Sequence, residues 1–231
     1  MKKKIVVLTG AGVSAESGIQ TFRDSDGLWE GHNVNDVATP EGWQRDPELV
    51  LDFYNQRRKQ LKTVLPNQAH EILVELENDF EVSIITQNVD NLHEKAGSTS
   101  VLHLHGELLK VRSTVHKNHI LDWTDDLVLG DFDDNGNQLR PHIVWFGEDV
   151  PAIEKAVAIV EKADFLIIIG TSLQVYPAAS LMNFANEDVP VYYIDPKPAT
   201  MYEVPNPLKI IEAIASTGMK TVQKELLNKR F

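Results

Sequence analysis

Four short runs of apolar residues recur along this chain, and each run ends at polar or glycine-containing positions. They cover residues 5–8, 82–86, 165–169 and 189–194. Short runs rich in valine and isoleucine, without an apolar–polar alternation, indicate strands that are buried on both faces. The pattern therefore predicts the strands of a parallel sheet.

Stretches with helical spacing lie between these runs. They cover residues 47–62, 67–77, 152–163 and 178–185, and a closing amphipathic helix is expected over residues 220–231. Strands that alternate with helices predict right-handed crossovers in an open α/β sheet. The predicted fold class is α/β, a Rossmann-like parallel sheet with helices on both faces.

Residues 108–139 interrupt this alternation. Residues 111–115 are followed by residues 127–139, in which Asn135-Gly136 is a strong hairpin-turn signal. We therefore predict a small, partly β module over residues 108–139, inserted in a main domain formed by residues 1–107 and 140–231.

The composition narrows the possible functions. The chain has 231 residues, with 22 Lys and Arg against 34 Asp and Glu, so its formal net charge is −12. This balance argues against nucleic-acid binding, which needs clustered cations. The absence of cysteine excludes disulfides, thiolate catalysis and Cys-bound metals. No apolar run is long enough for a membrane helix or a signal peptide, so we expect a cytoplasmic protein that does not bind membranes.

Glycines follow the first predicted strand directly. Gly10, Gly12 and Ala15 form a G-x-G-x-x-A pattern, in which the backbone around Ala11 can approach a pyrophosphate and helix-start amides can hold its charge. A tight turn without a ligand would show the same spacing. Residues 19–30 also lack the second acidic strand of a dehydrogenase, so a nucleotide would be held in a less common way.

Polar residues follow the other predicted strands. They are Gln87–Asp90, Gly170–Ser172 and Asp195. Ligands of open α/β sheets bind beyond the carboxyl ends of the strands, so all these segments are expected to line one crevice. Turn capping is the alternative role for Asn88 and Asp90.

Five blocks of sequence, in order and across nearly the whole chain, resemble those of the sirtuins, which are NAD-dependent protein-lysine deacylases. The blocks are residues 10–24, 86–93, 104–107, 139–148 and 170–175. The resemblance implies NAD as cofactor and acyl-lysine proteins or peptides as substrates. It implies nicotinamide, free lysine and O-acyl-ADP-ribose as products.

The resemblance also assigns roles. His105 would be the general base on a ribose hydroxyl, which suits an imidazole that titrates near neutrality. Asn88 would order the ribose and a water, and Asp90 would meet the nicotinamide carboxamide. The predicted catalytic residues are therefore His105 and Asn88. The predicted NAD-binding residues are Gly10, Ala11, Gly12, Ala15, Glu16, Thr21, Phe22, Arg23, Gln87, Asn88, Asp90, Gly170, Thr171, Ser172 and Asp195.

The resemblance also bears on the choice of nucleotide and on the peptide. Many sirtuins carry Asn where this chain has Asp195, and a carboxylate there should disfavour a 2′-phosphate and select NAD over NADP. Val144, Phe146 and Gly147 resemble the edge along which an extended peptide adds as a strand.

Tyr54 and Arg57 lie three residues apart, on one face of a predicted helix. They match the Tyr-x-x-Arg pair of sirtuins that accept succinyl- and malonyl-lysine. A guanidinium can grip a distal carboxylate with two hydrogen bonds, and a phenol adds a third. In the alternative interpretation, Arg57 and Arg58 are solvated charges on a helix surface.

The small module carries a structural zinc on four cysteines in most of the family. Ser113 and His116 stand at the first pair here, and the second pair falls near Phe132 and Asn135. These side chains cannot form a closed tetrahedral zinc site, so no zinc is expected. His116, His119 and His142 could regroup around a metal, but their irregular spacing favours surface roles.

The sequence predicts a deacylase that is monomeric. Two alternatives remain open at this point: mono-ADP-ribosyl transfer to a protein nucleophile, and a non-catalytic NAD-sensing module. The presence of His105, Asn88 and Asp90 argues against the sensor, because a pure binder needs no base.

Overall fold

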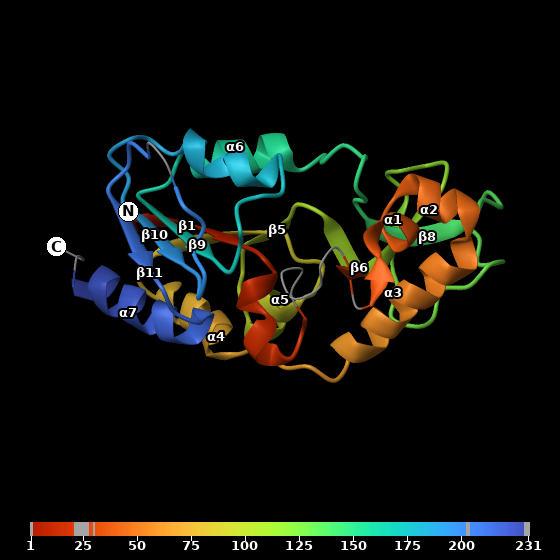
Figure 1. Ribbon diagram of the computed structural model, residues 1–231, viewed down its shortest axis with the longest axis horizontal. Coiled ribbons are helices and arrows are strands. Elements are labelled where there is room, and N and C mark those ends of the chain that lie inside the picture. The colour runs from red at the N-terminus through yellow and green to blue at the C-terminus, as the bar shows by residue number, and fades with distance from the viewer. Residues whose placement is uncertain (1, 21–27, 30, 202–203, 229–231) are drawn as a thin grey trace.

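The computed structural model describes residues 2–20, 28, 29, 31–201 and 204–228. Its centre is a six-stranded sheet in the order β11-β10-β9-β1-β4-β5, and all neighbouring strands are parallel (Figure 1). The strands are β1 (Lys4–Thr9), β4 (Glu81–Thr86), β5 (Val101–His103), β9 (Phe165–Ile169), β10 (Val191–Ile194) and β11 (Leu208–Ile211). The predicted α/β fold class is confirmed.

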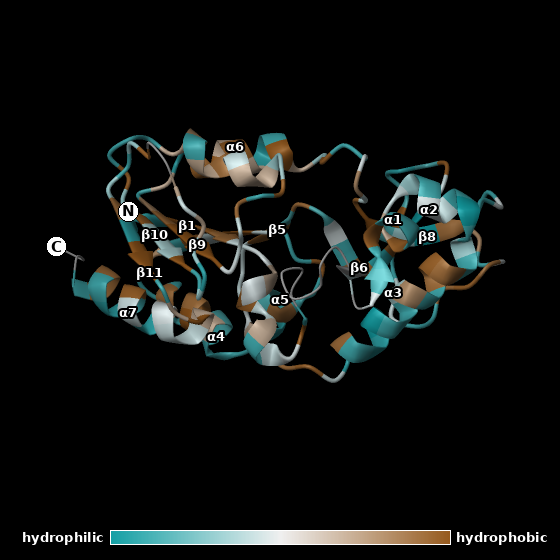
Figure 2. Ribbon diagram, viewed as in Figure 1, coloured by the Kyte–Doolittle hydropathy of each residue, from teal (hydrophilic) through white to brown (hydrophobic). Residues whose placement is uncertain are grey.

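Each face of this sheet is covered by its own helices. On one face α4 (Gln68–Leu76) and α7 (Ala215–Asn228) pack, and on the other α6 (Ile153–Val160) and the 3-10 helix η4 (Ala178–Phe184), as Figure 1 shows. Successive residues of β1 alternate between the two cores, with Val7 in one and Val6 in the other. This double burial explains the continuous apolar runs, which Figure 2 shows as brown strands inside the molecule.

Three of the four helical stretches predicted between the strands are α-helices. The stretch at 47–62 is α3 (Pro47–Leu61), and those at 67–77 and 152–163 are α4 and α6. Asn67 and His70 close a capping box at the start of α4. The stretch at 178–185 is instead η4, where the Ser180 hydroxyl donates to the Pro177 carbonyl (2.7 Å) and competes for the backbone acceptor.

Both edge strands of the sheet lack the pattern that predicted the inner four. β5 has three residues and β11 has four, of which Lys209 and Ile210 are exposed. Such short, half-polar segments have no continuous apolar run. The closing helix also begins earlier than predicted, at Ala215, while residues 229–231 lie outside the described part of the chain.

A second group of elements stands beside the large sheet (Figure 1). A three-stranded antiparallel sheet, in the order β7-β6-β8, shares an apolar core with α3 and α1. These elements, with the neighbouring short ones, are β6 (Gly106–Ser113), β7 (Ile120–Asp122), β8 (Leu139–Ile143), α1 (Val34–Val37), α2 (Pro40–Arg45), α5 (Leu92–Ala96), β2 (Leu28–Trp29) and β3 (His32–Asn33). The turn at Asn135-Gly136 is confirmed, since Gly136 has φ +79° and Phe132 bridges Gln138. The division of the chain at residues 108 and 139 stays a prediction.

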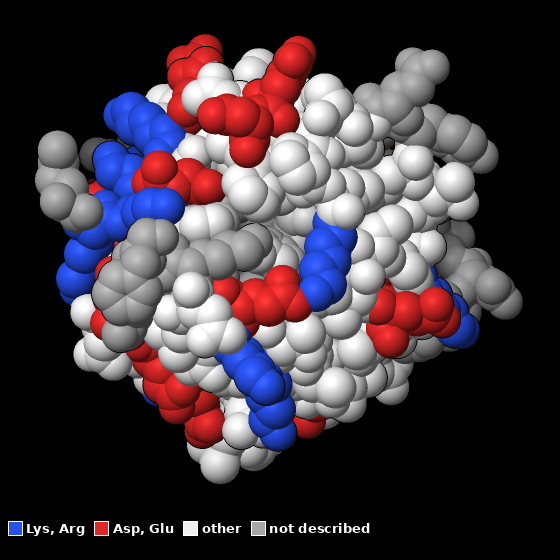
Figure 3. Space-filling model, turned by 90° about the vertical axis from the view of Figure 1, so that its left-hand side faces the viewer, with Lys and Arg blue, Asp and Glu red and all other residues white. Residues whose placement is uncertain are grey.

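Charged side chains of both signs are interspersed on the face that Figure 3 shows. None of the helices within the described ranges is long and apolar enough to cross a bilayer.

Candidate active site

The loops that follow β1 and β9 meet beyond the carboxyl ends of these strands. The amide of Gly12 donates to the carbonyl of Gly170 (2.8 Å). A Cβ on Gly12 would lie 2.6 Å from the Gly170 Cα, and one on Gly10 would lie 2.8 Å from the Thr171 Cβ. Both glycines are therefore required by the contact between the two loops, which the glycine spacing alone did not reveal. The predicted convergence is confirmed for these two segments.

The segment after Gly10 does not begin an α-helix. It forms two 3-10 turns, η1 (Ala11–Val13) and η2 (Ala15–Ser17), and ends at Gly18, whose φ is +91°. The amide of Val13 donates to Gly10, and that of Ser14 donates to Ala11. The expectation of a helix start with amides open to a pyrophosphate is wrong for Gly12, Val13 and Ser14, because these amides are used within the protein.

Glu16 has a partner far away in the sequence. One carboxylate oxygen accepts from the Ser216 amide (2.9 Å) and the other from its hydroxyl (2.6 Å), so Glu16 caps the first turn of α7. No sequence signal connected these two positions, which are 200 residues apart. Three other predicted NAD-binding residues, Thr21, Phe22 and Arg23, lie outside the described part of the chain.

A buried polar cluster joins the first loop to the loop after β4. The side-chain Nδ2 of Asn88 donates to the Ser14 hydroxyl (3.1 Å), which donates to Asp90 Oδ2 (3.0 Å). The other Asp90 oxygen accepts from the Leu92 amide (3.1 Å). Burial raises the pKa of Asp90, although the bonds from Leu92 and Ser14 oppose that shift. Ser14 was not predicted as a site residue, although it lies inside the first motif.

His105 lies half-buried at the start of β6, and its Nδ1 is 3.0 Å from the Gln87 carbonyl oxygen. A carbonyl only accepts, so Nδ1 carries the proton of the neutral ring and Nε2 keeps its lone pair. Burial lowers the pKa of His105, against a raising effect of the Gln87 bond. The side chain is therefore a neutral imidazole near pH 7, with its basic nitrogen turned away from Gln87.

His103, two residues earlier, differs from His105 in that its pKa is raised and not lowered. Its Nδ1 lies 3.0 Å from the Asn88 carbonyl and its Nε2 lies 2.8 Å from a Glu94 oxygen. Both partners accept, so both nitrogens donate only in the charged ring. Burial alone would lower the pKa of His103, but the bond and charge of Glu94 raise it above its ordinary value. His103 and His105 thus hold two consecutive carbonyls of the loop after β4.

Thr171 and Asp195 follow β9 and β10, two neighbouring strands of the large sheet. Gln87 Nε2 donates to the Thr171 hydroxyl (3.2 Å), which links the loops after β4 and β9. Asp195 follows β10, is 2% exposed and accepts from the Lys197 amide (2.8 Å). A neutral base, buried amide and carboxyl groups, and a carboxylate at the end of a strand are groups that suit the ribose and carboxamide of NAD. These residues therefore fit that cofactor.

Tyr54 and Arg57 lie on α3, in the apolar cluster that α3 shares with the small sheet. Tyr54 is fully buried, and its hydroxyl accepts from the indole N–H of Trp145 (3.0 Å). Burial raises the pKa of Tyr54, so the phenol stays protonated. Arg57 Nη1 donates to the Phe53 carbonyl (2.8 Å), and its guanidinium carbon lies 3.9 Å from the centre of the Phe53 ring.

Arg58 is not the solvated charge considered above. It is 1% exposed, and it donates from Nε to the Leu108 carbonyl (3.1 Å) and from Nη1 to Asn55 Oδ1 (2.7 Å). Asn55 also exchanges two hydrogen bonds with the backbone of Leu127. Arg58 and Asn55 therefore join α3 to the small module, and nothing in the local sequence distinguishes Arg58 from its exposed neighbours.

The expected peptide edge, Val144–Gly147 in sequence, already uses several of its amides. The Val144 amide donates to His105 (2.9 Å) and the Phe146 amide to Ala38 (3.0 Å). The Phe146 side chain is 48% exposed, and Gly147 has φ +88°. A strand added here would have to find other backbone partners than these two amides, so the peptide role stays a prediction.

Hydrogen bonds stand at the positions of the family's zinc ligands. The Ser113 hydroxyl accepts from the amides of Val115 and His116 and bonds the carboxylate of Asp133. Asp133 also accepts from the amides of Asn137 and Asn135, and the Ser113 bond, followed by these two, holds its pKa well below its ordinary value. Among the residues that the structure describes, no group of three or more His, Asp or Glu is placed to hold a metal ion.

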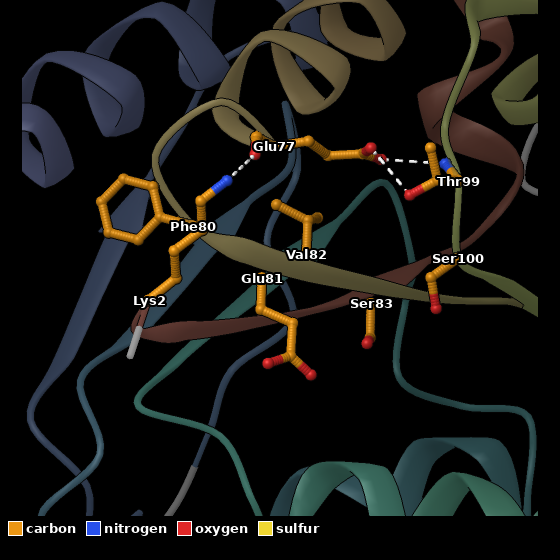
Figure 4. Close-up of a pocket in the computed structure, with 8 residues that line it drawn as sticks. All are labelled: Lys2, Glu77, Phe80, Glu81, Val82, Ser83, Thr99 and Ser100. Atoms are coloured by element: carbon orange, nitrogen blue, oxygen red, sulfur yellow. Dashed lines mark hydrogen bonds between the residues drawn. The ribbon is translucent and has the colours of Figure 1, made fainter.

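A surface hollow elsewhere on the molecule does not belong to this site. Figure 4 shows it around Lys2, Glu77 and Glu81, at the amino end of β4. Gln87 follows the opposite end of the same strand.

Comparisons with known proteins agree with this geometry. The sequence profile of the Sir2 family matches residues 10–177. An NAD-dependent protein deacylase of Helicobacter pylori (strain ATCC 700392 / 26695) is 56% identical over 225 residues, which cover 97% of this chain and 98% of that protein. A Bacteroides thetaiotaomicron protein of the same name is 53% identical over 231 residues, again covering 97% and 98%.

Solved structures give the same result. The crystal structure of a Sir2 homolog–NAD complex has a TM-score of 0.86 and 37% identity, covering 100% of this chain and 91% of that one. A structure described as Sir2 bound to acetylated peptide has a TM-score of 0.78 and 27% identity, covering 97% and 93%.

Proposed function

Since this chain belongs to the Sir2 family and is an NAD-dependent protein deacylase, we propose that it removes acetyl and also succinyl or malonyl groups from lysine. The products would be nicotinamide, free lysine and O-acyl-ADP-ribose. The observation that carries the proposal is the state of His105, a neutral imidazole whose Nδ1–H is fixed on Gln87. A base of this kind is needed for transfer of an acyl group to a ribose hydroxyl.

The chain's own residues would divide the work as follows. When bound, NAD supplies the ribose carbon that receives the acyl oxygen. His105 accepts a proton from a ribose hydroxyl at Nε2, while the Gln87 carbonyl stabilises the resulting positive ring through Nδ1–H. Asn88 orders the ribose and its neighbouring water, and Asp90, whose pKa is raised by burial, meets the carboxamide.

The remaining assignments form part of the same proposal. Asp195 accepts from a ribose hydroxyl and selects NAD over NADP, and the acyl-lysine peptide lies along Val144, Phe146 and Gly147. The phosphates of NAD would lie against the loops after β1 and β9, and the contact between these two loops supports this assignment. The loop residues are Gly10, Ala11, Gly12, Ala15, Gly170, Thr171 and Ser172.

Mass spectrometry of acetyl- and succinyl-lysine peptides, incubated with the protein with and without NAD, tests the reaction. NAD-dependent acyl loss together with O-acyl-ADP-ribose supports the proposal. Peptides that stay unchanged despite NAD binding would contradict it, and ADP-ribose attached to protein would replace it with ADP-ribosyl transfer.

Arg57→Met tests the acid pocket. Removal of the guanidinium should lower desuccinylation kcat/KM roughly ten- to a hundredfold, because a hydrogen-bonded ion pair to the carboxylate is lost. Deacetylation should fall much less, since an acetyl group has no carboxylate. Arg45→Met is a matched control, because Arg45 pairs with Asp36 on a neighbouring exposed surface. Equal losses with both substrates would contradict the pocket.

A further inference from the structure

Trp145 and Tyr54 lie together in the apolar cluster that α3 shares with the small sheet. Tyr54 comes from α3 and Trp145 follows β8, 91 positions later in the sequence. The indole nitrogen lies 3.0 Å from the phenol oxygen, and both side chains are buried, with exposed fractions of 2% and 0%. This is a hydrogen bond between two large side chains in an otherwise apolar cluster.

The direction of this bond is fixed by chemistry. An indole N–H can only donate, so the phenol oxygen of Tyr54 must accept. The phenol proton therefore cannot lie on the bond to Trp145, and it points to another side of the oxygen. A group that reaches the hydroxyl from there meets a donor, and a carboxylate is the acceptor that gains most from such a donor.

Trp145 is itself held in place by a charged pair. The guanidinium carbon of Arg140 lies 3.2 Å from the centre of its ring, and Arg140 is paired with Glu148 (2.8 Å). Glu148 also accepts from the backbone amide of Trp145 (2.9 Å). The ring of Trp43 packs against the same indole, with centroids 5.9 Å apart. Rotation of the indole would break several of these contacts at once.

We propose that Trp145 is a positioning residue for acyl selection: its N–H holds the Tyr54 hydroxyl as a hydrogen-bond donor to the carboxylate of a succinyl or malonyl group. This inference rests on the proposed acid pocket. Trp145 acts through Tyr54 and need not touch the substrate. Arg57, one helical turn further on α3, supplies the charge, and Trp145 sets the direction of the second contact.

Trp145→Phe removes the N–H and keeps an aromatic ring beneath Arg140. The ratio of succinyl to acetyl kcat/KM should fall about two- to tenfold, mainly through a higher KM for the succinyl peptide, because one hydrogen-bonding constraint is lost. Trp43→Phe is the matched control. It disturbs packing on the same indole and leaves the bond to Tyr54 intact, so the ratio should stay constant.

A double-mutant cycle separates this role from a packing defect. In the Tyr54→Phe background, Trp145→Phe should change the ratio no further, because the indole then has no phenol to position. An equal additional fall in that background, or an unchanged ratio in the single variant, would overturn the inference while leaving the deacylase intact. Failure of the wild-type protein to remove succinyl or malonyl groups would instead remove the acid pocket itself, and the inference with it.

Melting temperatures give a second reading if Trp145→Phe is too unstable to assay. Tyr54→Phe leaves the buried indole N–H without its acceptor, whereas the double variant removes both partners. The double variant should therefore melt higher than the sum of the single shifts predicts. If the two shifts were simply additive, the hydrogen bond between Trp145 and Tyr54 would make no contribution to stability, and this result would also overturn the inference.

Discussion

The large parallel sheet and the small module are stabilised in different ways. Strand β9 is entirely apolar, its residues are at most 5% exposed, and each buried side chain of this kind contributes about 1.5–3 kcal/mol. The small module has a core cluster of only a few buried residues, and several of its large apolar side chains are exposed. Its order depends on polar contacts, above all those of Asp133 with Ser113, Asn135 and Asn137.

The residues proposed for catalysis are therefore different from those that stabilise the two regions. The candidate catalytic side chains stand on loops at the edge of the strongly apolar sheet, so they can be changed without opening a core. The hydrogen bonds of Asp133 join residues of the module to one another, so their loss should affect activity only through the module's order.

His105→Ala should have the largest effect, a loss of activity with little loss of stability. Loss of the base should lower kcat/KM for acyl removal about 10²- to 10⁴-fold. The melting temperature should change little, because the side chain is half-buried and makes one hydrogen bond to Gln87. Steady-state kinetics and a thermal melt measure both effects. His119→Ala, in the small module, is the control, and a loss below tenfold for His105→Ala would contradict its assignment.

Asp133→Ala should have the opposite effect, a local loss of stability in the small module with little direct effect on the chemical step. It removes the acceptor shared by Ser113, Asn135 and Asn137, so protease cleavage within residues 114–137 should accelerate about tenfold, while cleavage in the large sheet stays constant. Asp134→Ala is the matched control at the neighbouring, exposed position.

Because the folded-state pKa of Asp133 is lowered, the stabilisation that Asp133 gives to the module is present above its ordinary pKa and is lost as pH falls towards the folded value. Unfolding of the wild-type module by a chelator would contradict stabilisation by the hydrogen bonds of Asp133.

The pH dependence of kcat/KM should show the smallest effect. Since burial lowers the pKa of His105, the neutral base persists below pH 6.5, and the acid limb of the profile should have its midpoint below that value. Glu94→Gln removes the carboxylate that raises the pKa of His103 and should leave this midpoint in place. A midpoint at or above 6.5, measured with the acetyl peptide, would mean that a different group carries the proton.

Sequence patterns predicted the parts of the fold that depend on local composition. The four inner apolar runs matched β1, β4, β9 and β10 because strands buried on two faces must be continuously apolar. Strand β11 was missed because two of its residues face solvent. The convergence of the loops followed from the general geometry of parallel sheets.

The polar contacts could not be predicted in the same way, because they connect distant positions. Arg57 and Arg58 look alike in sequence, yet only the fold places Arg58 against the Leu108 carbonyl. The charge difference between His103 and His105 depends on a single carboxylate, Glu94, in another element. The bond from Trp145 to Tyr54 likewise depends on how β8 meets α3.

The link between Glu16 and Ser216 has a consequence for the newly made protein. Translation delivers the glycine loop early, but its η2 turn lacks the Ser216 partner until 200 further residues have been added. Strand β1 must also wait for β9 to cover one of its edges. A polypeptide released early by the ribosome is therefore expected to lack a complete nucleotide pocket. Such incomplete products should be inactive and should not consume NAD.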